Sequence, residues 1–200
     1  WKDIAFRITG EGVKHYTYMF VEFWNAFSKD KIDAEVIRNS GKYCIAGDKK
    51  DRGYMLPYYD APTRSEAVSN VLFIELLSSA TKYVWFYTPY LMLGESLYDA
   101  FIRAARRGVD VRIIMPGIPD KKTIYRISRS YYGDLMEAGV KIYEYKPGFI
   151  HAKACIVDDR LAGIGTVNLD YRSLFLHYEC YSLFYKADII KDLKADFEET

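Results

Sequence analysis

The stretch FIHAKACIVDDRLAGIGTVNLDYRS, from Phe149 to Ser173, decides how this chain is interpreted. Its first half reads as a buried strand that carries two basic residues, His151 and Lys153, two positions apart. Alternate residues of a strand share a face, so this spacing places the imidazole and the ammonium together. Asp158 has the opposite parity, and we expect it to hold the turn that follows the strand.

An imidazole beside an ammonium is suited to an anion rather than to a divalent metal ion. A phosphodiester between His151 and Lys153 would be neutralised, with its phosphorus in reach of a ring nitrogen. The next strand leads through a glycine to Thr166 and Asn168, whose hydroxyl and amide can donate to phosphoryl oxygens. Glu179 on the strand after that could orient the imidazole. The sequence therefore predicts a phosphate site without a metal ion or a cofactor.

From residue 63 onward, helical and strand patterns alternate along the chain. Helices are expected at 64–80, 95–107, 121–138 and 188–198, and strands at 83–88, 109–115, 140–145, 152–157, 161–166 and 177–185. This order predicts an α/β fold, with a mixed, mostly parallel β-sheet flanked by helices on both faces.

The first part of the chain has a different organisation. Residues 3–9 predict a strand, 11–27 an amphipathic helix, and 28–62 a polar, glycine-containing connector with a short strand near its end. An ungapped alignment with the closing strand and helix brings Asp3 opposite Glu179, which indicates a faint internal repeat.

These patterns predict three segments. Residues 1–27 are the expected tail of a preceding repeat, residues 28–62 a connector, and residues 63–200 a complete second domain.

The composition excludes several classes of protein. Lys and Arg number 28 against 27 Asp and Glu, so the formal net charge is only +1 and gives no strong long-range attraction to nucleic acid. Cys44, Cys155 and Cys180 are odd in number and lack paired spacing, which is typical of free thiols in a reducing compartment. No apolar run approaches the ~20 residues of a membrane-spanning helix.

Two of the expected helices are rich in basic residues. These residues are Arg103, Arg106 and Arg107 on one helix, and Lys121, Lys122, Arg126 and Arg129 on the other. Such runs usually form solvated helix faces, and lipid headgroup binding is the alternative.

The decisive stretch also resembles a known family. HAKACIVD fits H-x-K-x4-D, and GTVN follows after six residues, which together resemble the signature of the phospholipase D superfamily. TPYLMLGESLYDAF, GVDVRIIMPGIPD, LMEAGVKIYEYKPGFIHAKACIVDD and GTVNLDYRSLFLHYE are similar to bacterial cardiolipin synthases over about 64–199. The opening WKDIAFRITG resembles the segment just after the first such motif in those enzymes.

The resemblance implies a catalytic set of His151, Lys153 and Asp158, and a two-step phosphoryl transfer through a phosphohistidine. His151 would be the general acid and base, and the nucleophilic histidine would come from the other motif. The transferred group would be phosphatidyl, passed to a second phosphatidylglycerol. The resemblance also implies a parent protein at the cytoplasmic face of the cell membrane, whereas this chain alone is expected to be soluble.

The chain departs from the family because it has no second H-x-K. His15 and His177, the other histidines, lie outside such a motif. One motif is half a site, so we expect the chain to need a missing N-terminal half and to have little activity alone.

Two alternatives stay open. One is a single-motif phosphodiesterase or nuclease that forms its site by homodimerisation, although the near-neutral charge makes nucleic acid an unlikely partner. The other is a binding module without activity, against which the intact His151, Lys153 and Asn168 argue. Gel filtration with a generic phosphodiester assay distinguishes these cases.

Overall fold

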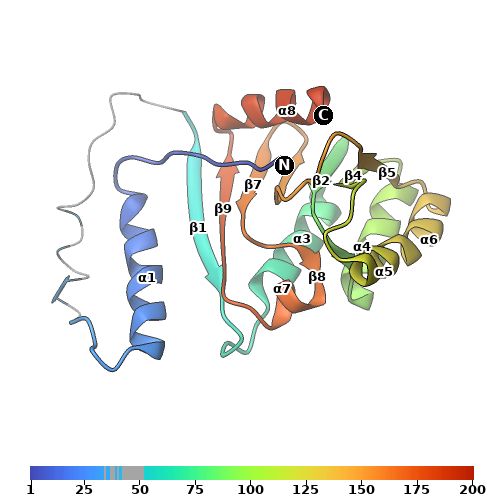
Figure 1. Ribbon diagram of the computed structural model, residues 1–200. Coiled ribbons are helices and arrows are strands. Elements are labelled where there is room, and N and C mark those ends of the chain that lie inside the picture. Colours follow the sequence, from blue (N-terminus) through green and yellow to red (C-terminus); the bar gives the residue numbers. More distant parts are fainter. Residues whose placement is uncertain (34, 37–38, 40, 42–51) are drawn as a thin grey trace.

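The computed structural model describes residues 1–33, 35–36, 39, 41 and 52–200, and its arrangement is shown in Figure 1. Part of the expected connector over 28–62 lies outside these residues. Its last part forms a strand as predicted, β1 (Tyr54–Asp60). This strand pairs with β9 (Glu179–Tyr185) along its whole length, so it belongs to the central sheet.

The central sheet has seven strands in the order β1-β9-β7-β6-β2-β4-β5. The remaining strands are β2 (Tyr83–Tyr87), β4 (Asp110–Pro116), β5 (Lys141–Tyr145), β6 (Ala154–Val157) and β7 (Leu161–Gly165). The mixed α/β class is confirmed. The expected parallel majority needs correction, because only β2–β4 and β4–β5 pair in parallel and the other four pairs are antiparallel. The short turn between β6 and β7 can join only antiparallel strands.

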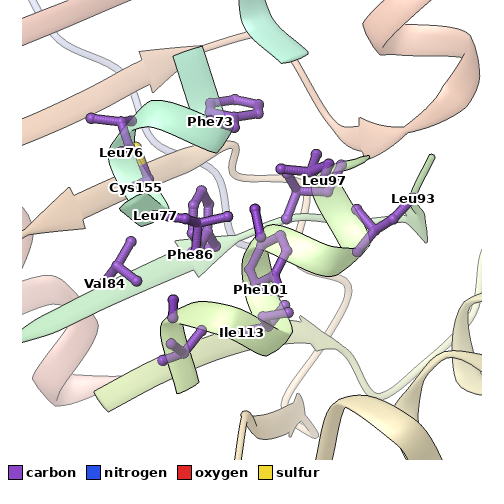
Figure 2. Packing of buried hydrophobic residues seen from close by; sticks show 14 of the residues in the cluster. Phe73, Leu76, Leu77, Val84, Phe86, Leu93, Leu97, Phe101, Ile113 and Cys155 are labelled. Carbon is purple, nitrogen blue, oxygen red and sulfur yellow. The ribbon is translucent and has the colours of Figure 1, made fainter. Parts of the chain in front are cut away.

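Helices cover both faces of the sheet, as predicted. α3 (Val68–Ser79), α4 (Glu95–Arg106) and α6 (Tyr132–Glu137) pack on one face, and α8 (Ile189–Glu199) packs on the other. Every residue of β2 is consequently buried. Val84 and Phe86 point into the cluster under α3 and α4, which Figure 2 shows. This strand is apolar throughout because both of its faces are covered.

Three short elements were not predicted. β3 (Leu91–Met92) and β8 (Leu169–Asp170) form a small parallel sheet, and α7 (Tyr171–Phe175) follows β8 directly. The single helix expected over 121–138 was wrong, because it divides into α5 (Lys122–Ser130) and α6. The division lies at Tyr131, the residue between the two helices.

The start of the chain is extended but does not join a sheet. Its one bridge in the part of the chain that the structure describes links Lys2 to Ile150. Exposure still alternates over residues 1–9, and Ile4 and Phe6 pack against the cluster under α8. The strand predicted for 3–9 was therefore wrong about pairing, although the alternation it was based on is present. α1 (Val13–Phe27) then confirms the helix expected over 11–27.

The two cysteines within the described residues, Cys155 and Cys180, are free thiols, and Cys44 lies outside those residues. None of the helices in the described ranges combines the length and the apolar character that crossing a membrane requires.

Candidate functional site

A cavity of about 580 Å³ opens at the end of β6 where the motif begins. Its lining consists of Asp3, Ile4, Ala5, His151, Lys153, Gly165, Thr166 and Asn168. β6 runs antiparallel to β2, and Ala154 pairs with Tyr87 at the carboxyl end of β2. The cavity therefore lies beyond the carboxyl end of a parallel strand, where α/β folds commonly place their ligands.

His151 and Lys153 immediately precede β6 instead of lying within it. The alternation nevertheless extends back to them. Cys155 packs in the cluster under α3 and α4, whereas Ala152 and Ala154 pack in the cluster under α8. His151 and Lys153 share the parity of Cys155 and both line the cavity.

His151 is oriented by the first residues of the chain. Its Nδ1 lies 3.1 Å from Oδ2 of Asp3, and its ring lies beside the rings of Trp1 and Phe149. Burial acts to raise the pKa of Asp3, but the hydrogen bonds from His151 and from the Ile4 amide outweigh it, so that the pKa is lowered. An ionised Asp3 accepts a hydrogen bond from Nδ1–H and leaves Nε2 as the second ring nitrogen.

Lys153 is only 8% exposed, and its ammonium donates a hydrogen bond to the backbone carbonyl of His151. Burial lowers the pKa of Lys153 to about 8, because an uncompensated ammonium is disfavoured away from water. The negative charges of Asp3, Glu179 and Asp170 oppose this effect. A phosphoryl group in the cavity would act in the same direction as these carboxylates and hold the lysine charged.

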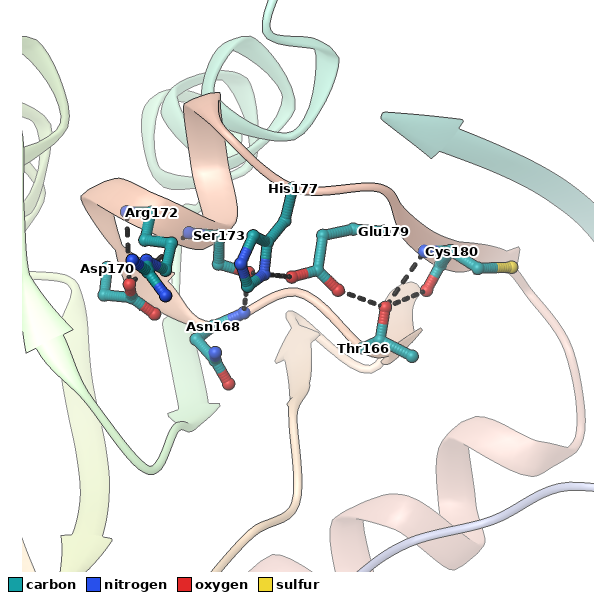
Figure 3. A network of polar contacts seen from close by, with 8 residues as sticks. All are labelled: Thr166, Asn168, Asp170, Arg172, Ser173, His177, Glu179 and Cys180. Atoms are coloured by element: carbon teal, nitrogen blue, oxygen red, sulfur yellow. Dashed lines mark hydrogen bonds and ion pairs between the residues drawn. The ribbon is translucent and has the colours of Figure 1, made fainter. Parts of the chain in front are cut away.

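Glu179 does not contact His151, contrary to the expected orienting role. Its Oε2 accepts a hydrogen bond from the Thr166 hydroxyl, and its Oε1 accepts one from Ser173 Oγ at 2.6 Å (Figure 3). His177 Nδ1 lies 3.4 Å from the same Oε1. Glu179 is 8% exposed and is the centre of a polar network at the start of β9.

Thr166 and Asn168 are held by this network in different ways. The Thr166 hydroxyl also accepts a hydrogen bond from the Cys180 amide at 2.9 Å, so it points toward β9. The backbone N–H of Asn168 donates a hydrogen bond to Ser173 Oγ at 2.9 Å, which fixes the backbone at this position. Figure 3 shows the side chain of Asn168 turned away from the network, and this residue lines the cavity. Asn168 is thus the better placed of the two to bind a ligand.

Ser173 and Asp170 were missed as site residues. Asp170 caps α7 by accepting hydrogen bonds from the Arg172 and Ser173 amides. The sequence did contain a signal for this cap. Asp170 is a favoured N-cap residue, and Ser173 follows it three positions later, where the capped amide of a helix start lies. α7 is one short turn, and no helical periodicity drew attention to that spacing.

Asp158 lies at the opposite end of β6, away from the cavity. Its carboxylate accepts hydrogen bonds of 2.8 Å from the amides of Thr81, Lys82 and Tyr83 and from the Thr81 hydroxyl. Its backbone has a φ of 53°. Asp158 therefore closes the β6–β7 turn onto the start of β2, as the parity argument expected, and contacts no cavity residue.

Two glycines of β7 allow the strand to pack closely against β9. A Cβ on Gly163 would lie 2.4 Å from the ring of Tyr181, and one on Gly165 would lie 2.3 Å from the Cys180 carbonyl oxygen. Gly165 also lines the cavity, so bare backbone forms part of its wall. Across the described ranges, no group of three or more His, Cys, Asp or Glu side chains is arranged to hold a metal ion.

Residues 73–200 match the family model described as "Cardiolipin synthase, PLD-like domain". The chain is 36% identical to cardiolipin synthase 2 of Bacillus cereus over 199 residues, which is 100% of this chain and 38% of that protein. An uncharacterised protein of Streptococcus mutans is 46% identical over 200 residues, which is 100% of this chain and 42% of that protein. The chain thus spans about two fifths of the length of these relatives.

Solved structures share the fold. The phospholipase D family member NUC from Salmonella typhimurium superposes with a TM-score of 0.59 at 17% identity. The match covers 74% of this chain and 93% of that one.

Proposed function

Since this chain belongs to the family of cardiolipin synthase, PLD-like domains, we propose that it is the C-terminal catalytic half of a cardiolipin synthase-like phosphatidyltransferase. The observation that carries the proposal is the joint exposure of His151 and Lys153 to one cavity, with Nδ1 of His151 already bound to a carboxylate. The reaction is the transfer of a phosphatidyl group between two phosphatidylglycerols at the cytoplasmic face of the membrane.

His151 acts as the general acid and base. With Nδ1 held by Asp3, Nε2 is the nitrogen that exchanges a proton with the substrate. In the first step a histidine from a second motif attacks phosphorus, and Nε2–H of His151 protonates the departing glycerol. In the second step Nε2 takes the proton from the hydroxyl of the acceptor lipid, which attacks the phosphohistidine.

Lys153 and Asn168 bind the phosphoryl oxygens. Both line the cavity, one as a cation and one through its side-chain amide. Thr166 acts by holding Gly165 and Asn168 in register with β9, because its hydroxyl is occupied by Glu179 and Cys180. Asp158 belongs to the motif but acts by fixing the turn that ends β6.

Glu179 is proposed to orient the histidine of the missing half. The faint repeat aligns Glu179 with Asp3, and Asp3 contacts a histidine that lies 148 positions away in the chain. The equivalent contact of Glu179 would then be with the histidine of the other motif. This arrangement explains why Glu179 approaches the site without contacting His151.

The test compares two proteins. The 200-residue chain and the full-length protein that contains it are incubated with phosphatidylglycerol vesicles, and cardiolipin and glycerol are measured. We expect turnover by the full-length protein, its loss in His151→Ala, and little or no turnover by the 200-residue chain. Robust cardiolipin formation by the chain alone would contradict the half-site. Hydrolysis of phosphodiesters by a dimer of the chain would support the single-motif alternative, so gel filtration accompanies the assay.

A further inference from the structure

Of the two basic helices, α4 ends near one end of strand β4 and α5 begins near its other end. α4 leads into the amino end of β4, so its arginines lie at the end of the strands that is away from the cavity. α5 follows the carboxyl end of β4 and therefore starts at the end of the strands where the cavity opens. Both helices are rich in basic residues, but they differ in the partners and neighbours of their basic side chains.

The arginines of α4 are partly satisfied within the fold. Arg107, the residue that follows α4, donates to the backbone carbonyls of Leu77 and Ser78, and Arg103 within the helix lies 3.9 Å from Asp99. Among the residues that the structure describes, α4 carries no exposed large apolar side chain. This helix has the properties of a solvated surface.

The exposed part of α5 and of the loop before it combines charge with apolar groups. We name this set the α5 surface, and it consists of Ile118, Lys121, Lys122, Arg126 and Ile127. Ile118 and Ile127 are 52% and 40% exposed. Within the described ranges, neither the Lys122 nor the Arg126 side chain makes an ion pair. The nearby carboxylate of Asp120 accepts a hydrogen bond from Tyr90.

The α5 surface is connected to the cavity through the small sheet. Ser128 of α5 accepts a hydrogen bond from the Leu91 amide in β3 at 3.0 Å, and Leu91 pairs with Leu169 in β8. Leu169 follows Asn168, which lines the cavity. These contacts place the α5 surface on the side of the fold where the cavity opens.

We propose that the α5 surface is the site at which this protein contacts an anionic phospholipid bilayer. Lys121, Lys122 and Arg126 are attracted to the lipid phosphates, and Ile118 and Ile127 enter the headgroup region. The charge complements an anionic membrane although the whole chain is nearly neutral. The proposal rests on the proposed function for the identity of the lipid, because phosphatidylglycerol is both the substrate and an anionic lipid.

The experiment uses the 200-residue chain and two kinds of vesicles, one of phosphatidylcholine alone and one of equal parts phosphatidylcholine and phosphatidylglycerol. Flotation measures binding by the wild type, by Lys122→Gln with Arg126→Gln, and by Arg103→Gln with Arg106→Gln as the matched control on α4. A cation near the surface contributes about fivefold to affinity, so the α5 pair should weaken binding to the anionic vesicles about 30-fold. The α4 pair should stay within about twofold of the wild type.

A second measurement does not depend on the folding of the charge variants. In a chain with Cys44 and Cys180 replaced by Ser, which leaves only the buried Cys155 beside the introduced thiol, a polarity-sensitive fluorophore on Ile127→Cys should shift to shorter wavelength with anionic vesicles. The same label on Arg103→Cys should not shift. Equal losses in the two charge pairs, or equal binding to both vesicle types, would overturn the proposal. Stronger, α5-dependent binding to a DNA oligonucleotide would overturn it as well and indicate a nucleic-acid surface.

The outcome is separable from that of the proposed function. Vesicle binding requires no turnover, so an inactive full-length protein with α5-dependent binding refutes only the proposed reaction. An active full-length protein whose chain binds vesicles independently of α5 refutes only this proposal.

Discussion

The two ends of β6 carry the charged residues of one motif and use them in opposite ways. At the turn, the carboxylate of Asp158 accepts four hydrogen bonds from within the fold. At the cavity, His151 and Lys153 have few internal partners and face open space. A signature that reads as one unit therefore contains one residue that is bound within the fold and two that line a cavity, separated by the length of a four-residue strand.

The difference shows that a motif residue can lie at a distance from the cavity that the rest of the motif lines. Asp158 fixes where β6 ends relative to β2, and β6 in turn fixes where His151 and Lys153 begin. Substitutions at the two ends should consequently separate activity from stability, and the following predictions test this separation.

The largest effect is expected at His151. His151→Ala in the full-length protein should lower kcat by about 10³-fold, because proton transfer to the departing alcohol is lost. The melting temperature should be nearly unchanged, since the ring is partly exposed. Cardiolipin assays and thermal unfolding measure the two quantities. If His151→Ala retained its kcat, or if it were unfolded, the distinction between a chemical end and a structural end of β6 would be wrong.

Asp158→Ala should mainly affect stability. Four hydrogen bonds to a carboxylate are lost, and we expect the free energy of unfolding of the 200-residue chain to fall by about 3 kcal/mol in urea titrations. Asp159→Ala is the matched control, because Asp159 also has a positive φ but is more exposed and pairs with Lys194. Its loss should be about 1 kcal/mol. Equal losses would show that the backbone, rather than the carboxylate, matters at Asp158.

The same residue gives a pH dependence. The backbone hydrogen bonds of Asp158 outweigh burial and lower its pKa below 3.8. An unfolded aspartate binds its proton at higher pH than the folded one, so the stabilisation is present at neutral pH and is lost as pH falls through the folded pKa.

Lys153 predicts an alkaline limit to activity. Its pKa of about 8 means that the ammonium is charged below this pH and neutral above it. The value of kcat/KM in the full-length protein should fall about tenfold per pH unit above pH 8 as the phosphate loses its cation. Lys153→Arg should abolish this decline, since guanidinium stays charged. The free energy of unfolding should instead rise as the pH increases from about 8 to 10.5, because in this range the unfolded lysine still binds its proton and the folded one has released it.

The smallest effect is expected for Asp3→Asn. The Asn side chain keeps the shape of Asp3 but removes the charge that holds Nδ1–H of His151. Because water can reach this partly exposed pair, we expect kcat to fall about tenfold with KM unchanged. Asp30→Asn, on the exposed segment after α1, serves as the control.

A larger loss of kcat in Glu179→Gln than in Asp3→Asn would support the proposed role of Glu179 in orienting the second histidine.

Much of the fold was predictable because local patterns determine it. The helices that became α3, α4 and α8 and the strands of the sheet are each long enough to show their periodicity. Whether strands pair in parallel depends on contacts far apart in the chain, and local periodicity carries no information about them. β3, β8 and α7 are too short for any periodicity.

The site was partly predictable for the same reason. Strand parity grouped His151 with Lys153 and separated Asp158 from them. The contact between His151 and Asp3 spans 148 positions. The alternation at the start of the chain shows which residues turn inward but not which part of the fold they pack against. Glu179 was assigned to His151 because both were expected on neighbouring strands, but the register of β7 and β9 instead places Gly165 beside Tyr181 and brings Thr166 to Glu179.

The paired glycines of β7 have a consequence for how new specificities can arise. Positions 163 and 165 admit no side chain without displacing Tyr181 or the β9 backbone. Substitution of either glycine is therefore expected to displace β9 and destabilise the fold instead of reshaping the cavity. Libraries aimed at a different acceptor alcohol should hold both glycines constant and vary Ala5, an exposed cavity residue on the extended start of the chain, which belongs to no sheet.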